Sequence, residues 1–145
     1  MQLVEQGKIH LDEPAEKYLP ELGTVKMING DAPKSKITMR QLLTHTAGFS
    51  YTFFDEELNE RYKKTGIDEF SGSREGTFGM PLVREPGQEW HYSTGIDWAG
   101  QVLEAVTKQT LGEYCKKNIF DPLGCKDIQF GVCLNTFIAS SKCSR

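Results

Sequence analysis

Helix-start signals occur at three places in this chain and limit the folds that it can adopt. In TMRQ, residues Thr38 to Gln41, the threonine hydroxyl can accept from the amide three residues on, while the glutamine side chain reaches back. The same capping box recurs in TLGE, Thr110 to Glu113, and TGID, Thr94 to Asp97, is a weaker version of it. Very little of the 145 residues shows the alternation of a strand. The sequence therefore predicts a mainly α protein.

The segment after Thr94 gives the clearest helical pattern. Its apolar residues Ile96, Ala99, Leu103 and Val106 are spaced i, i+3, i+7 and i+10, which predicts a helix that buries this stripe. A second apolar pattern (Leu111, Tyr114, Cys115, Ile119) predicts the next helix. Residues 55–64 are expected to form a charged surface helix that ends at Gly66, and residues 71–79 a loop or frayed helix.

Composition and charge exclude several classes of function. The net charge of −3 and the pI near 5.6 give no basic field for nucleic acid. No apolar run approaches the roughly 18 residues that span a bilayer, so no membrane partner is expected. The N-terminus lacks the basic and apolar regions of a signal peptide, which leaves the location undetermined, with the cytoplasm as default. The four cysteines form no Cys-x-x-Cys pair; we expect free thiols, although two disulfides are possible.

No cofactor or metal motif is present in the sequence. His10, His45 and His91 lie far apart and have no companion ligand at metal-site spacing, so no metal is expected. The glycine patterns of phosphate-binding and dinucleotide-binding loops are missing, and we expect no cofactor. No serine lies in a Gly-x-Ser-x-Gly nucleophile elbow.

Two stretches are more specific, QLLTHTAGFSY (41–51) and REPGQEWHYSTGIDWAGQVLE (84–104). With LVEQGKIHLDEPAEKYLPEL and LGEYCKKNIFDPLG, they resemble the serine β-lactamase superfamily: class C β-lactamases, related esterases, and acyltransferases that finish some polyketides. The resemblance covers residues 1–130, and 131–145 is expected to be a divergent C-terminal tail. It implies the helical subdomain of the α+β β-lactamase/transpeptidase-like fold, with most of the sheet absent.

The resemblance also implies a chemistry. In that family the serine of Ser-x-x-Lys attacks an ester or β-lactam carbonyl, and a tyrosine shares the proton transfer. Tyr92 lies at the matching position, as the predicted catalytic residue, with Trp90 and Thr94 as predicted substrate-binding residues. A phenol with a pKa of about 10 is a poor base at neutral pH, so flanking cations are expected to favour its phenolate. Thr94 replaces the asparagine of class C enzymes, which favours the esterase and acyltransferase branch over β-lactam turnover.

The nucleophile of the family is missing from these residues. No serine has a lysine three residues later, and we expect the Ser-x-x-Lys two to three helical turns before Met1. Lys64-Thr65-Gly66 matches another family triad but precedes Tyr92 instead of following it, so we interpret it as coincidence. The 145-residue chain is therefore predicted to be inactive alone. The substrate of an intact relative would be a small-molecule ester or lactam.

Several alternatives stay open. Tyr92 could pack beside Trp90 and Trp98 at a helix entrance without catalysing anything. His45 is expected to hold a turn rather than react. Tyr51 and Phe53 fit an acyl pocket or loop packing equally well. The alternative function is a non-catalytic helical binding module derived from the same fold.

Overall fold

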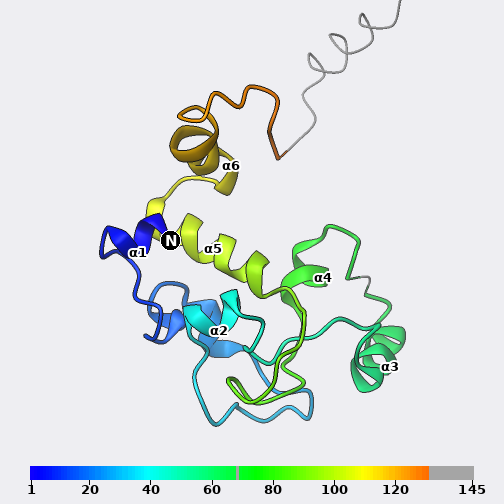
Figure 1. The fold of residues 1–145 in the computed structure, drawn as a ribbon. Coiled ribbons are helices and arrows are strands. Elements are labelled where there is room, and N and C mark those ends of the chain that lie inside the picture. The colour runs from blue at the N-terminus through cyan, green and yellow to red at the C-terminus, as the bar shows by residue number, and fades with distance from the viewer. Residues whose placement is uncertain (68, 131–145) are drawn as a thin grey trace, which may run out of the picture. The chain divides into compact units, whose positions relative to one another are not determined.

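The structure is a computed structural model that describes residues 1–67 and 69–130 (Figure 1). The chain divides into two compact units, Met1–Val106 and Thr107–Arg145. The tail predicted for residues 131–145 lies outside the described residues, and the domain boundary predicted after Phe130 stays a prediction.

The first unit is built from short helices joined by long connections. They are α1 (Gln2–Glu5), η1 (Ala15–Lys17), η2 (Pro20–Thr24), α2 (Met39–Leu43), α3 (Glu56–Thr65), α4 (Arg74–Phe78) and α5 (Gly95–Thr107). Among the described residues, extended pairing is limited to two isolated bridges, Pro14 with Thr38 and Met27 with Leu82. The mainly α class predicted from the sequence is confirmed.

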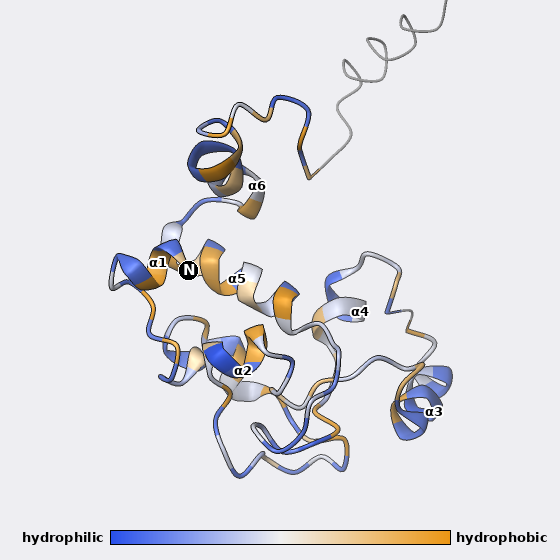
Figure 2. Ribbon diagram, viewed as in Figure 1, coloured by the Kyte–Doolittle hydropathy of each residue, from blue (hydrophilic) through white to orange (hydrophobic). Residues whose placement is uncertain are grey.

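Local capping signals explain where these helices begin and end. Thr38 and Gln41 form the predicted capping box at the start of α2. Asp55 caps α3, which ends at Gly66 in the left-handed conformation, and Figure 2 shows α3 as almost entirely hydrophilic. The predicted capping at Thr94 is wrong, because its side chain is buried and its Oγ1 makes no hydrogen bond in the described part of the chain.

The core of the first unit lies between α2, α5 and the loops that carry Phe49 and Leu82. The buried face of α5 is Gly95, Trp98 and Val102, and this corrects the stripe predicted from the sequence. Ile96, a member of that stripe, is 50% exposed. The reason is steric: a Cβ at Gly95 would lie 2.4 Å from the Leu42 carbonyl oxygen, so the glycine face is the one that approaches α2.

The second unit contains α6 (Leu111–Cys115) and the π-helical turn η3 (Lys116–Phe120). The predicted capping box of Thr110 and Glu113 is present. Of the apolar pattern predicted here, only Tyr114 is buried. Cys115 and Cys125 carry free thiols. Across residues 1–67 and 69–130, no helix has the length and apolar character needed to cross a membrane.

Candidate functional site

The phenol of Tyr92 lies at the surface of the first unit. Its side chain is 50% exposed, and its ring centroid lies 4.7 Å from that of His45 and 5.8 Å from that of Tyr51. Its oxygen makes no hydrogen bond to another described residue. The side chain is therefore not sealed in apolar packing, and its hydroxyl is free to exchange a proton with a ligand.

The turn after α2 fixes the backbone beside Tyr92. The Thr46 amide donates to the Gln41 carbonyl at 2.9 Å and the His45 amide to that of Leu42 at 3.5 Å, which is the Schellman ending of a helix. His45 occupies the position that normally belongs to glycine, with φ of 57°, at a cost of about 1 kcal/mol or more. The His45 carbonyl accepts the His91 amide at 2.9 Å, and its Nδ1 accepts the Ser93 amide at 3.3 Å.

Two glycines bring the two family-like stretches into contact. Gly48 has φ of 94°, and a Cβ there would lie 2.1 Å from the Arg84 carbonyl oxygen. Its own carbonyl accepts the Val83 amide at 2.8 Å and the Arg84 amide at 3.2 Å. Gly95 makes the corresponding close approach to Leu42. Residues 41–51 and 84–104, which the sequence singles out separately, therefore pack on each other.

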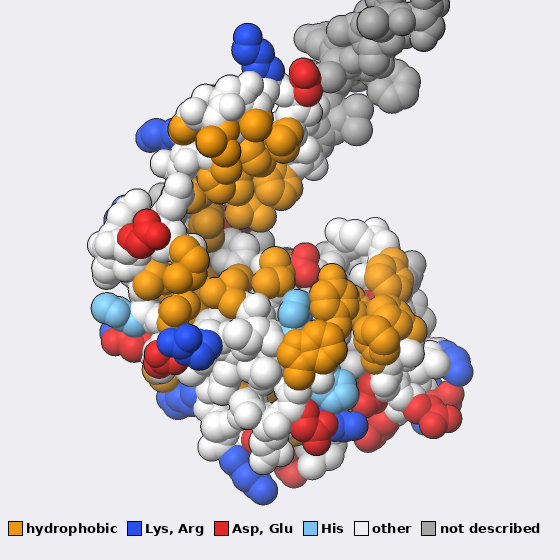
Figure 3. Space-filling view, viewed as in Figure 1, with side chains coloured by type: hydrophobic (Ala, Val, Ile, Leu, Met, Phe, Trp, Pro, Cys, Tyr) orange, Lys and Arg blue, Asp and Glu red, His pale blue; other side chains and the backbone are white. Residues whose placement is uncertain are grey.

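An aromatic cluster, formed by Tyr51, Phe53, Phe54 and Phe70, adjoins Tyr92. The Tyr51 and Phe53 rings are stacked with centroids 5.2 Å apart and planes 10° apart, and Phe70 lies 6.0 Å from Tyr51 at 17°. The three phenylalanines are largely exposed, Phe70 by 68%. Figure 3 shows apolar side chains gathered on this face beside histidine side chains. Such a patch is typical of a binding surface.

Buried Glu69 joins the two segments that supply the aromatic cluster. Its carboxylate accepts the Thr52 amide at 3.1 Å, which holds the loop of Tyr51 and Phe53 against Phe70. Burial raises the pKa of Tyr51, and the charge of Asp97 adds to this. Tyr51 therefore remains a neutral phenol beside Tyr92. Sequence reasoning missed Phe70, because α3 separates it from Tyr51 along the chain.

The two predicted substrate-binding residues, Trp90 and Thr94, lie in different surroundings. Trp90 is exposed, and its ring meets His45 edge-on with centroids 6.2 Å apart. Thr94 is buried, so its hydroxyl does not share the surface on which Tyr92 lies. Both roles stay predictions. Trp98 belongs to the core, where it packs against Phe49 and Phe78.

Charged residues near the site are paired with one another. Glu89 lies 3.1 Å from His91 Nε2 and 3.3 Å from Arg84 Nε. The hydrogen bond from His91, together with Arg84, lowers the pKa of the Glu89 carboxyl. Arg84 also faces the buried carboxylate of Asp55 at 3.6 Å. No group of three or more potential metal ligands occurs within residues 1–67 and 69–130.

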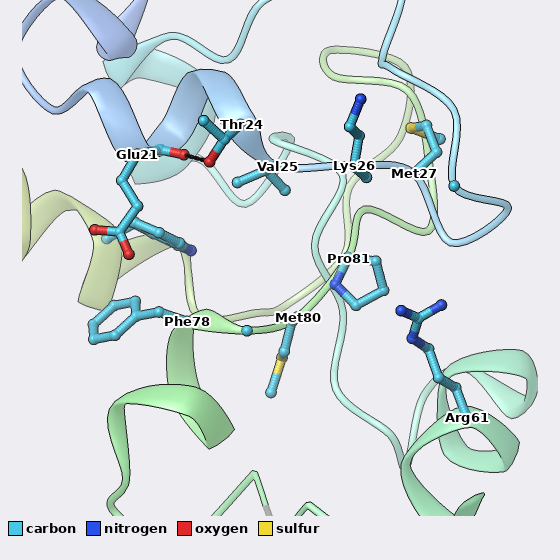
Figure 4. Close-up of a pocket in the computed structure, with 12 residues that line it drawn as sticks. Glu21, Thr24, Val25, Lys26, Met27, Arg61, Phe78, Met80 and Pro81 are labelled. Atoms are coloured by element: carbon cyan, nitrogen blue, oxygen red, sulfur yellow. Dashed lines mark hydrogen bonds between the residues drawn. The ribbon is translucent and has the colours of Figure 1, made fainter. Parts of the chain in front are cut away.

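A separate cavity of about 370 Å³ contains none of the predicted site residues. Trp98 contributes to its wall together with Lys26 and Pro81, and Figure 4 shows Arg61 pointing from α3 toward Pro81. Glu21, also in the lining, is paired with Arg74. The cavity is thus distinct from the surface that carries Tyr92.

Comparisons with known proteins agree with the geometry. The lovastatin esterase of Penicillium rubens is 39% identical over 141 residues, which cover 90% of this chain and 35% of the relative. The monacolin J acid methylbutanoyltransferase of Aspergillus terreus is 36% identical over 142 residues, 90% of this chain and 34% of the relative.

Solved structures give the same result. The unliganded simvastatin synthase of Aspergillus terreus (selenomethionyl derivative) matches with a TM-score of 0.79 at 33% identity, covering 96% of this chain and 37% of that one. This chain spans about a third of the length of these relatives. The sequence model described as Beta-lactamase matches residues 1–141. The chain therefore belongs to the β-lactamase family, and esterases and acyltransferases are among its relatives.

Proposed function

We propose that these residues supply the proton-transfer tyrosine and part of the substrate-binding surface of a serine-dependent esterase or acyltransferase. The observation that carries the proposal is the accessible phenol of Tyr92 beside the aromatic cluster. A general base must be within reach of the proton that it removes. A half-exposed hydroxyl that makes no hydrogen bond within residues 1–67 and 69–130, on a backbone held by His45, supports this role because it is open to an incoming proton.

In the proposed reaction Tyr92, in its phenolate form, takes the proton of a serine hydroxyl as the serine oxygen attacks the ester carbonyl. The C–O bond to the alcohol then breaks, and the proton passes to the leaving oxygen, which gives an acyl-enzyme. Water or a second alcohol attacks the acyl-enzyme in the reverse sense. Each step conserves charge, because the negative charge passes between the phenolate and the oxyanion of the ester, and no metal or cofactor takes part.

The aromatic cluster favours an ester with a bulky apolar portion. Flat rings that are already stacked and exposed offer contact area with little loss of side-chain freedom. Two relatives have names that refer to lovastatin and to monacolin J acid. We therefore propose a small-molecule ester as substrate, and Thr94 in place of asparagine favours esters over β-lactams.

A chimera tests the role of Tyr92. The matched segment of the Penicillium rubens lovastatin esterase is replaced by the residues of this chain that align with it, and hydrolysis of a p-nitrophenyl ester is measured. Tyr92→Phe should lower kcat by roughly 10²- to 10⁴-fold, the usual contribution of a general acid–base group, with KM nearly unchanged. The matched control is Tyr18→Phe, because the Tyr18 hydroxyl bonds Glu13 elsewhere in the first unit. Full activity in Tyr92→Phe would refute the role.

The 145-residue polypeptide by itself is proposed to be inactive, because it contains a candidate base and no Ser-x-x-Lys nucleophile. The same p-nitrophenyl assay applies to it without any fusion. Turnover above the uncatalysed rate that disappears in Tyr92→Phe would contradict this part of the proposal.

The exposed phenylalanines of the aromatic cluster also suit a second candidate, a non-catalytic binding module. A module must fold independently. A sharp and reversible thermal transition in a monomeric sample would support this function, whereas aggregated or molten material would contradict it.

A further inference from the structure

We propose that His45 is a positioning residue that fixes Tyr92 through its side-chain nitrogen. The inference rests on the proposed function of Tyr92, and it assigns to His45 a task beyond ending α2. Its carbonyl and its Nδ1 bind the amides on the two sides of Tyr92, those of His91 and Ser93.

The backbone of His45 is the first part of the argument. Among the described residues, the non-glycine residues with positive φ are His45 and Lys108. Glycine or asparagine would meet the same left-handed requirement with less strain. Strain of this kind persists where other contacts over-determine the conformation. The Lys108 side chain is exposed and makes no hydrogen bond or ion pair with another described residue, whereas His45 contacts the tyrosine segment.

The side chain of His45 is the second part. Its Nδ1 accepts the Ser93 amide at 3.3 Å, and its ring lies against Tyr92 with centroids 4.7 Å apart and an interplanar angle of 44°. Because an amide can only donate, Nδ1 must present a lone pair, which places the proton of the neutral ring on Nε2. The imidazole is therefore an acceptor for the Ser93 amide and a ring contact for Tyr92.

The two hydrogen bonds respond differently to substitution. Any residue at position 45 retains the carbonyl that accepts the His91 amide. Only a side chain with an acceptor at the position of Nδ1 retains the bond to Ser93. Asparagine carries its amide oxygen on the same Cγ and tolerates positive φ, whereas glycine tolerates the conformation and has no acceptor. His45→Asn and His45→Gly therefore separate the acceptor from the helix ending.

The first experiment measures amide hydrogen exchange by NMR in the 145-residue chain. In His45→Gly the Ser93 amide should exchange about tenfold faster, as expected for loss of one hydrogen bond, while the Trp98 amide inside α5 should be unchanged. In His45→Asn the Ser93 amide should remain protected. If the two variants exchange alike at Ser93, fast or slow, the acceptor role is refuted. Loss of protection at Trp98 in His45→Gly would also refute it, because His45 would then support the whole fold.

The second experiment measures kinetics in the chimera with the lovastatin esterase. His45→Gly should lower kcat by about tenfold or more with a small change in KM, since a misplaced catalytic group lowers the rate of the chemical step, and His45→Asn should restore most of it. Equal activity of the two variants would refute the positioning role. If instead Tyr92→Phe is fully active while the Ser93 exchange behaves as expected, the function proposed for Tyr92 fails and the contact by His45 stands.

Discussion

The contact between Gly95 and Leu42 allows a stability change to be worked out from the structure. An alanine Cβ at position 95 would lie 2.4 Å from the Leu42 carbonyl oxygen, and contacts below 3.0 Å essentially do not occur, so α5 and α2 must separate by at least 0.6 Å. Overpacking of this kind costs about 1–3 kcal/mol. The higher helix propensity of alanine returns at most about 1 kcal/mol. Because the clash is with backbone, which cannot rotate away, the overpacking cost lies in the upper part of that range, and Gly95→Ala should destabilise the chain by about 1–2 kcal/mol.

Thermal unfolding followed by circular dichroism measures this effect. A loss of that size corresponds to a fall in Tm of roughly 3–8 °C for a chain of this length. Gly112→Ala is the matched control, because it is also a first-turn helical glycine, but its Cβ would meet Phe130 at an ordinary 3.5 Å. The control should leave Tm unchanged or slightly raised. An equal or higher Tm in Gly95→Ala would refute the reasoning, because α5 would then not depend on this close approach.

Three further predictions concern caps, titration and the core. Thr38→Ala should lower the unfolding free energy by about 1 kcal/mol through loss of the α2 cap, measured by urea unfolding. Burial, followed by the charge of Glu69, raises the pKa of Tyr62 from 10.0 to about 12. The folded state thus favours the neutral phenol. This contribution to stability is complete below pH 10.0 and is lost as the pH rises toward 12. Tyr62→Phe should therefore lose less unfolding free energy than the unsubstituted chain over that pH range. Val102→Ala should lower the unfolding free energy by about 2 kcal/mol, and Val106→Ala, at a half-buried position, by less than about 1 kcal/mol. Urea unfolding measures both, and the reverse order would mean that the face predicted from the sequence is the buried one.

Features set by neighbours in the chain could be predicted from the sequence. The capping boxes of Thr38 and Thr110 need only a partner three residues later, and both form. Asp55 and Gly66 likewise mark the ends of α3. The cap predicted at Thr94 does not form although its spacing was suitable: the residue is buried, and its hydroxyl makes no hydrogen bond in the described part of the chain.

Features set by contacts between distant residues could not be predicted in the same way. Helical periodicity identifies residues that share a face of α5, but Ile96 and Trp98 lie on two adjacent apolar faces. The choice between these faces depends on the approach of Gly95 to Leu42. The aromatic cluster is similar: Phe70 joins Tyr51 only because α3 and Glu69 bring the two segments together.

The contacts around Tyr92 explain why two individually weak sequence motifs are informative together. The turn of residues 44–48 cannot close without a residue that adopts positive φ at position 45 and a side-chain-free position at Gly48. The segment that carries Tyr92 in turn takes its position from His45 and from the packing of Gly95 on Leu42. Each stretch thus supplies the surface that the other needs. A substitution in residues 44–48 should therefore act on the tyrosine as strongly as one beside it, which is the coupling that the His45 variants measure.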